Sequence, residues 1–152
     1  MFSILTMVWM ILEKTLGWHD AQIGKQLIYT NLFGFVAVAI YILALLEKKK
    51  QFFKGNISWK QGFLSGTVLT VVIAVLSPMV NAVVYTYITP RFFDTMVAYR
   101  VAHKFQTLTQ AKAYFNLHSY IVLGIFDTLS KGILTAAIIA FFIKTKNTSD
   151  EK

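Results

Sequence analysis

The chain has 152 residues, of which 56% are hydrophobic, 15% aromatic and only 14% charged. A typical soluble domain has about 25% charged residues, so this composition excludes a soluble globular enzyme and also a disordered chain. The net charge is +8, and because the basic residues lie between apolar runs, the polyanion that they fit is the phospholipid bilayer and not a nucleic acid.

Four apolar segments are candidates to cross a bilayer, which takes about 20 mostly apolar residues. Three of them meet this length, namely residues 27–46, 62–88 and 120–143. The first segment, residues 1–12, is shorter because Glu13 and Lys14 follow it directly, and a spanning helix here must continue to about Trp18. We interpret it as a transmembrane helix and not as a secretory signal, because no basic region precedes it and no small-residue cleavage site follows it.

The sequence therefore predicts an all-α membrane protein with four transmembrane helices and a short amphipathic helical segment between the third and the fourth. This segment lies within residues 89–119, where Thr89 and Pro90 predict a helix start and Thr109 predicts the cap of a second short helix. We expect both helices to lie along the membrane surface. They form either a structured cap over the bundle or a lid or docking surface for a partner.

Basic residues beside the apolar segments predict the orientation, because cytoplasmic loops are enriched in Lys and Arg. Eight of them lie on one side, in the loop between the second and third segments and in the C-terminal tail: Lys48, Lys49, Lys50, Lys54, Lys60, Lys144, Lys146 and Lys152. The other side holds six over a longer stretch. We therefore expect both termini in the cytoplasm, a transmembrane domain over residues 1–144 and a flexible cytoplasmic tail over residues 145–152.

The loop between the second and third segments also interleaves lysines with aromatic residues, a pattern typical of contact with anionic lipid headgroups. The residues expected to make this contact are Lys48, Lys49, Lys50, Lys54, Trp59 and Lys60. Control of topology alone would also explain the lysines, so both interpretations stay open.

Small residues recur at every fourth position in the third and fourth segments, a pattern that lets membrane helices approach closely. The third carries Gly62, Gly66, Thr70, Ala74, Pro78 and Ala82, and the fourth carries Gly124, Thr128, Gly132, Ala136 and Ala140. We expect these two helices to cross along the two ridges or one ridge to form a homodimer contact, although glycine and alanine are common in transmembrane helices. Pro78 should bend the third helix, and Ser77 is placed to bond the carbonyl of Ala74 that the proline frees.

Ionisable residues inside an apolar segment suggest a functional site, because charge in hydrocarbon is costly. Asp127 and Lys131 lie one turn apart in the fourth segment, in the order that favours an ion pair, so one interpretation is a self-satisfied pair. The other is a polar pocket, since the expected orientation places Glu13, Asn31, Asn81 and Asp127 in the outer half of the membrane. If these side chains converge, with Lys131 beside them, they would bind a headgroup, a small solute or a proton.

Signatures of catalysis, metal binding and cofactor binding are absent from the sequence. No cysteine is present, which excludes disulfides and Cys-based metal sites. The three histidines, His19, His103 and His118, match no zinc motif, even with Asp20 or Asp94 as a further ligand. No nucleophile elbow, phosphate loop or dinucleotide-binding turn occurs. We therefore expect no catalytic residue, no metal site and no cofactor.

Several short stretches resemble a bacterial integral-membrane family known as domain of unknown function 4199. They include Leu12-Glu13-Lys14, Gly17-Trp18-His19-Asp20, Tyr29-Thr30-Asn31-Leu32-Phe33, Trp59-Lys60-Gln61-Gly62-Phe63-Leu64-Ser65-Gly66, Leu76-Ser77-Pro78, Tyr87-Ile88-Thr89-Pro90 and Ala113-Tyr114-Phe115-Asn116-Leu117. The resemblance covers nearly the whole chain. It implies a four-span protein of the bacterial inner membrane and no assigned activity.

Two functions from different classes fit these observations. The first is a non-catalytic membrane scaffold or partner subunit that contacts a second copy of itself or another membrane protein. The alternative is a small transporter or a lipid- or solute-binding protein that uses the polar pocket in the outer half of the membrane. An intramembrane enzyme is a third class, for which the sequence holds no supporting motif.

Overall fold

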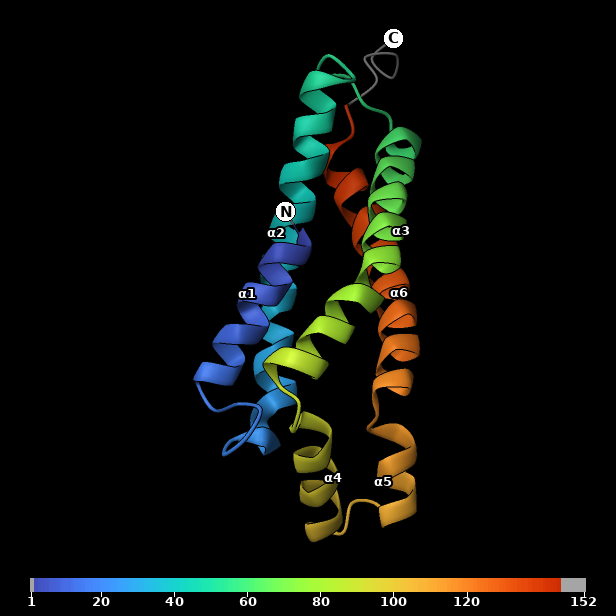
Figure 1. Ribbon diagram of the computed structural model, residues 1–152. Coiled ribbons are helices and arrows are strands. Elements are labelled where there is room, and N and C mark those ends of the chain that lie inside the picture. Colours follow the sequence, from blue (N-terminus) through green and yellow to red (C-terminus); the bar gives the residue numbers. More distant parts are fainter. Residues whose placement is uncertain (1, 146–152) are drawn as a thin grey trace.

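The computed structural model describes residues 2–145, and within them it is entirely helical. Figure 1 shows a long bundle in which α2, α3 and α6 run along the length of the molecule, while α4 and α5 extend one end of it. The elements are α1 (Phe2–Thr15), η1 (Ile23–Lys25), α2 (Gln26–Gln51), α3 (Trp59–Val83), the π-helical turn η2 (Val84–Ile88), α4 (Phe92–Ala102), α5 (Leu108–Tyr114) and α6 (Leu117–Ile143). The predicted all-α class is therefore confirmed.

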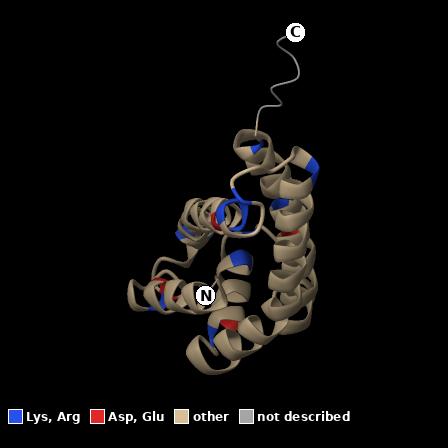
Figure 2. Ribbon diagram, turned by 90° about the horizontal axis from the view of Figure 1, so that it is seen from above, with Lys and Arg blue, Asp and Glu red and all other residues tan. Residues whose placement is uncertain are grey.

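Three segments, and not four, are long and apolar enough to cross a membrane in the described part of the chain. They are Ile28–Gln51, Trp59–Ile88 and Leu117–Ile143. Few residues in them are charged, and Figure 2, which looks along the bundle, shows how little of the ribbon is acidic or basic. In a membrane, these apolar helices would be solvated by lipid tails.

The prediction that the first segment spans the membrane is not supported, because α1 is too short. It has 14 residues, which rise about 21 Å, and it ends before Trp18. Gly17 stops it by adopting a positive φ of 74°, and the amides of Gly17 and Trp18 bond back to the carbonyls of Lys14 and Glu13. Figure 1 shows α1 packed along only part of α2.

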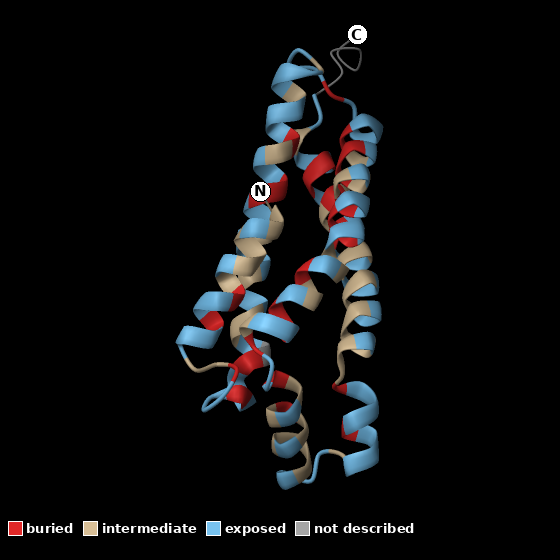
Figure 3. Cartoon of the chain, in the orientation of Figure 1, coloured by how far each residue is buried: buried red, intermediate tan, exposed pale blue. Residues whose placement is uncertain are grey.

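Helices α3 and α6 pack closely because small residues face each other along both. A Cβ atom added to Gly62 would lie 3.0 Å from the Ala140 Cβ, and one added to Gly66 would collide with the Ala136 Cβ. Figure 3 shows buried residues of α3 and α6 on the sides where these helices meet. The two small-residue ridges thus form a contact inside one chain.

A hydrogen bond attaches α2 to the same packed region. The Tyr41 hydroxyl lies 2.9 Å from the Thr70 hydroxyl, which also donates to the Gly66 carbonyl at 2.9 Å. A Cβ on Gly132 would lie 2.7 Å from the Thr70 Oγ1 and 2.9 Å from the Tyr41 hydroxyl, so only glycine leaves room for this pair. In a membrane, such a bond also keeps two hydroxyl groups away from hydrocarbon.

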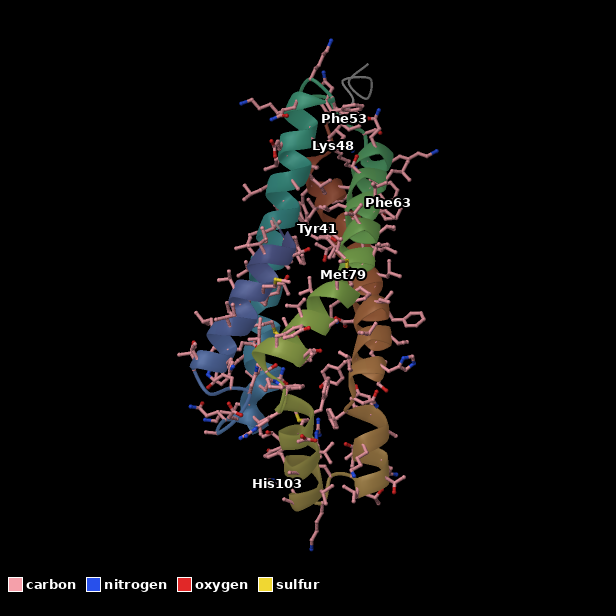
Figure 4. All side chains as sticks on the ribbon, in the orientation of Figure 1. Tyr41, Lys48, Phe53, Phe63, Met79 and His103 are labelled. Atoms are coloured by element: carbon pink, nitrogen blue, oxygen red, sulfur yellow. The ribbon has the colours of Figure 1, made fainter. Side chains whose placement is uncertain are left out.

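Helix α3 bends at Pro78, next to Met79 in Figure 4, and its lower part turns toward α1. The Ser77 hydroxyl donates to the Ala74 carbonyl at 3.0 Å, and this is the carbonyl that the proline leaves without an amide partner. Below the bend, aromatic rings from η2, α4 and α6 pack against one another. The Tyr85 ring centroid lies 4.9 Å from that of Phe93 and 5.6 Å from that of Tyr120.

The segment between η2 and α6 forms two helices, but neither starts where the sequence analysis predicts. Arg91 and not Thr89 occupies the N-cap position of α4, without a hydrogen bond from its side chain, and Thr107 caps α5 in place of Thr109. Thr107 forms a capping box with Gln110, a residue pair that is not among the expected helix starts. Both helices run roughly along the axis of the molecule, and not across it as a surface layer would (Figure 1).

The lysine-rich loop and the end of α6 meet at one end of the molecule. Lys49 donates to the Ile143 carbonyl at 2.7 Å, and the Thr145 amide donates to the Ile57 carbonyl at 2.9 Å. Of the tail predicted over residues 145–152, Thr145 is therefore attached to this loop, and residues 146–152 lie outside the described residues.

Candidate functional site

A buried carboxylate connects α1, the loop after it and α2. Glu13 is fully buried, and its Oε1 accepts a hydrogen bond from the Trp9 indole at 2.6 Å. Its Oε2 lies 2.8 Å from the His19 Nε2 and accepts a bond from the Thr30 hydroxyl at 3.1 Å. Both oxygens are thus satisfied, which is the condition for keeping a carboxylate inside a protein.

The network continues beyond the carboxylate to Gln26, which donates to the Thr30 hydroxyl at 2.8 Å. The His19 ring meets the Phe92 ring edge-on, with centroids 5.2 Å apart, so α4 closes this side of the pair. The His19 Nδ1 and the Gln26 Oε1 are buried without a hydrogen-bond partner among the described residues. Nor do those residues hold a group of three His, Asp or Glu side chains suited to a metal ion.

The sequence alone does not predict the pairing of His19 with Glu13. The three histidines match no metal-binding spacing, so the expected topology places them on the outer side as separate residues. The signal that was available is Gly17, since a glycine after a helix end often reverses the chain. That reversal brings His19, which follows Glu13 by six residues, back against the carboxylate.

A second ionisable pair lies on α6, where Asp127 and Lys131 form an ion pair at 2.8 Å. Their side chains are 57% and 67% exposed, so they point away from the rest of the chain. The pair lies near the midpoint of a 27-residue apolar helix. In a membrane, this ion pair would face either lipid tails or another protein.

The structure does not bring Glu13, Asn31, Asn81 and Asp127 together into one pocket. Glu13 is enclosed by its own partners, whereas Asp127 is exposed beside Lys131. Asn31 is exposed on α2, and the Asn81 amide faces Gly124 on α6, whose added Cβ would lie 3.1 Å from the Asn81 Nδ2.

The residues expected to touch lipid headgroups lie together at the lysine-rich end, where Lys48 is labelled in Figure 4. Some of them already have partners inside the chain. Lys48 lies 5.7 Å from the centre of the Phe52 ring, and the Trp59 indole donates to the Ala137 carbonyl at 3.2 Å. Lys50, Lys54 and Lys60 are exposed and free to contact a membrane surface.

Comparison with known proteins identifies a family. Residues 1–145 match the family described as Protein of unknown function (DUF4199). No curated protein and no solved structure matches the chain. Any functional conclusion must therefore come from the geometry.

Proposed function

Because the chain belongs to the DUF4199 family, whose description states no activity, we propose from its geometry that it is a non-catalytic membrane scaffold subunit that assembles with a second copy of itself. The contact is the outer face of α6, by which we mean Phe126, Asp127, Ser130, Lys131 and Leu134. The observation that carries this proposal is the exposed Asp127–Lys131 pair near the midpoint of an apolar helix.

The cost of exposing this pair to lipid supports a protein partner. A charged residue at the centre of a membrane helix costs about 3 kcal/mol on the scale derived from helix insertion, and such residues almost always face a protein interior or a water-filled cavity. Pairing within α6 reduces the cost, but both side chains remain largely exposed. A second protein surface would remove them from lipid.

The arrangement of the two charges suggests that the partner is a second copy. Asp127 and Lys131 lie one helical turn apart on the same face. In a parallel twofold dimer, each residue lies at the same depth as its counterpart, so Asp127 of one copy is one helical turn from Lys131 of the other and the opposite charges can interact diagonally. Ser130 lies between the two charges and is small, so it allows the helices to approach closely.

The lysine-rich end gives the orientation of this proposed subunit. The α2–α3 loop and the end of α6 lie together, and both carry lysines. By the rule that basic residues stay in the cytoplasm, this end faces the cytoplasm of a bacterial inner membrane. The Glu13 network then lies toward the opposite side of the bilayer.

Disulfide crosslinking tests the proposed dimer directly, because the natural chain has no cysteine. We expect Ser130→Cys in lipid nanodiscs to form a crosslinked dimer under mild oxidation. Val75→Cys, which places the thiol on an exposed part of α3, is the matched control and should stay monomeric. Adding Asp127→Leu and Lys131→Leu to Ser130→Cys should reduce crosslinking, because the charges that join the copies are gone.

Two results would contradict the proposed dimer. One is equal crosslinking of the Ser130→Cys and Val75→Cys proteins, which indicates random collision. The other is undiminished crosslinking after both charges are replaced by leucine. Exchanging the charges, with Asp127→Lys and Lys131→Asp together, should preserve the dimer because each acid still lies one helical turn from a base of the other copy.

A further inference from the structure

A groove of about 480 Å³ lies between α4, α5 and the start of α6. Its apolar lining includes Phe93 and Val97 of α4 together with Leu108 of α5 and Phe115, which directly follows α5. The Arg100 guanidinium lies 5.4 Å from the centre of the Phe115 ring and helps to hold that ring in place. The groove therefore offers an apolar surface just beyond the ends of the membrane-spanning helices.

Two opposite charges line the same groove, Asp94 from α4 and Lys112 from α5. Both are exposed, and neither side chain has a hydrogen-bond or ion-pair partner within residues 2–145. The side chain of the third polar residue of the lining, Asn116, already forms hydrogen bonds within the chain. Its amide donates to the Lys112 and Ala113 carbonyls, and its oxygen accepts from the Ser119 amide.

We propose that this groove binds a zwitterionic membrane phospholipid with a primary ammonium group, such as phosphatidylethanolamine. The ammonium would donate to Asp94, the phosphate would accept from Lys112, and the first part of an acyl chain would lie on the apolar lining. Charge complementarity selects this occupant, because an anionic phospholipid leaves Asp94 without a partner and places its own charge near a carboxylate. A choline headgroup carries no N–H donor for Asp94.

The size and position of the groove fit this occupant. Small-molecule sites enclose about 300–1,000 Å³, so the groove holds a headgroup and a short length of chain. It lies where the second apolar span has ended at Ile88 and the third begins at Leu117, at the level where lipid headgroups meet the protein (Figure 1). The proposal does not depend on the dimer, because the groove contains no residue of the outer α6 face.

Lipid retention tests the site. The full chain is placed in nanodiscs that contain equal amounts of phosphatidylethanolamine, phosphatidylglycerol and phosphatidylcholine with identical acyl chains, and native mass spectrometry then counts the lipids that stay bound. We expect the protein to retain phosphatidylethanolamine preferentially. Asp94→Asn should lower the ratio of ethanolamine to glycerol lipid by about threefold, the size expected for one exposed charge pair. Lys112→Gln should lower the retention of both phosphatidylethanolamine and phosphatidylglycerol, because both carry a phosphate.

Control variants show whether the groove is responsible. Asp20→Asn and Lys104→Gln change exposed charges outside the groove lining and should leave the lipid profile unchanged. Ala98→Trp should block retention while both charges remain, because Ala98 is exposed and lines the groove. Preferential retention of phosphatidylglycerol, or an Asp94→Asn or Ala98→Trp profile identical to that of the natural chain, would overturn the proposal.

Discussion

Replacing Gly66 by leucine should push α3 away from α6 and lower the free energy of unfolding by about 3 kcal/mol or more. A Cβ at this position would collide with the Ala136 Cβ and lie 3.2 Å from the Ala136 Cα. Neither atom can rotate aside, so the helices themselves must separate. Unfolding in detergent, followed by circular dichroism as a function of added denaturing detergent, measures the loss.

Gly34→Leu is the matched control for this prediction. Gly34 also lies in a membrane-spanning helix, but no atom lies within 4 Å of a Cβ added there, and the residue is exposed. Its replacement removes a helix-disfavouring glycine, so we expect unchanged stability or a gain of up to about 1 kcal/mol. If Gly66→Leu were as stable as Gly34→Leu, the close contact between α3 and α6 would not contribute to folding.

Replacing Glu13 by leucine should release the end of α1 and the following loop, at a cost of about 3–5 kcal/mol. The change leaves the buried His19 ring and the half-buried Trp9 indole and Thr30 hydroxyl without their common partner. Hydrogen exchange at the amides of Trp18 and Gln22 should accelerate, because both bond within this loop. Exchange measured in nanodiscs by mass spectrometry gives the local loss of protection.

Three further variants test whether the loss of stability comes from the hydrogen bonds of the Glu13 carboxylate or from mutation of this region in general. Glu13→Gln keeps an oxygen that accepts from Trp9 and should cost less than Glu13→Leu. Asp20→Asn changes an exposed acid in the same loop and should alter stability by no more than about 0.5 kcal/mol. Adding His19→Leu to Glu13→Leu should cost less than the sum of the two single changes, because the pair interacts directly. Strict additivity would show that the two side chains do not act together.

The family resemblance and the all-helical class could both be predicted from the sequence, and both are confirmed. Composition is sufficient for this level of prediction, because long uncharged segments are stable in lipid only as helices. The small-residue spacing on the third and fourth segments also identified positions at which the two helices approach. Steric size is a local property of each residue, and it can be read without knowing the fold.

The candidate site could not be predicted to the same extent, because it depends on how each helix is rotated. In water, apolar periodicity distinguishes the buried side of a helix from its exposed side. In lipid, both sides are apolar, so this signal does not show whether Asp127 points inward or outward. The expected pocket assumed that four polar side chains face the interior, whereas Asp127 and Asn31 are exposed.

The sequence by itself determined that most of this chain belongs in lipid, that long apolar helices form it, and that two of them can pack closely through glycine and alanine. Only the tertiary structure decided that α1 ends at Thr15, that His19 returns to the buried Glu13, and that the Asp127–Lys131 pair faces outward. Composition and residue size are properties of the residues themselves and do not depend on how the helices pack. The direction of a polar side chain is instead set by helix rotation and by contacts between residues far apart in the chain, such as Glu13 with Thr30.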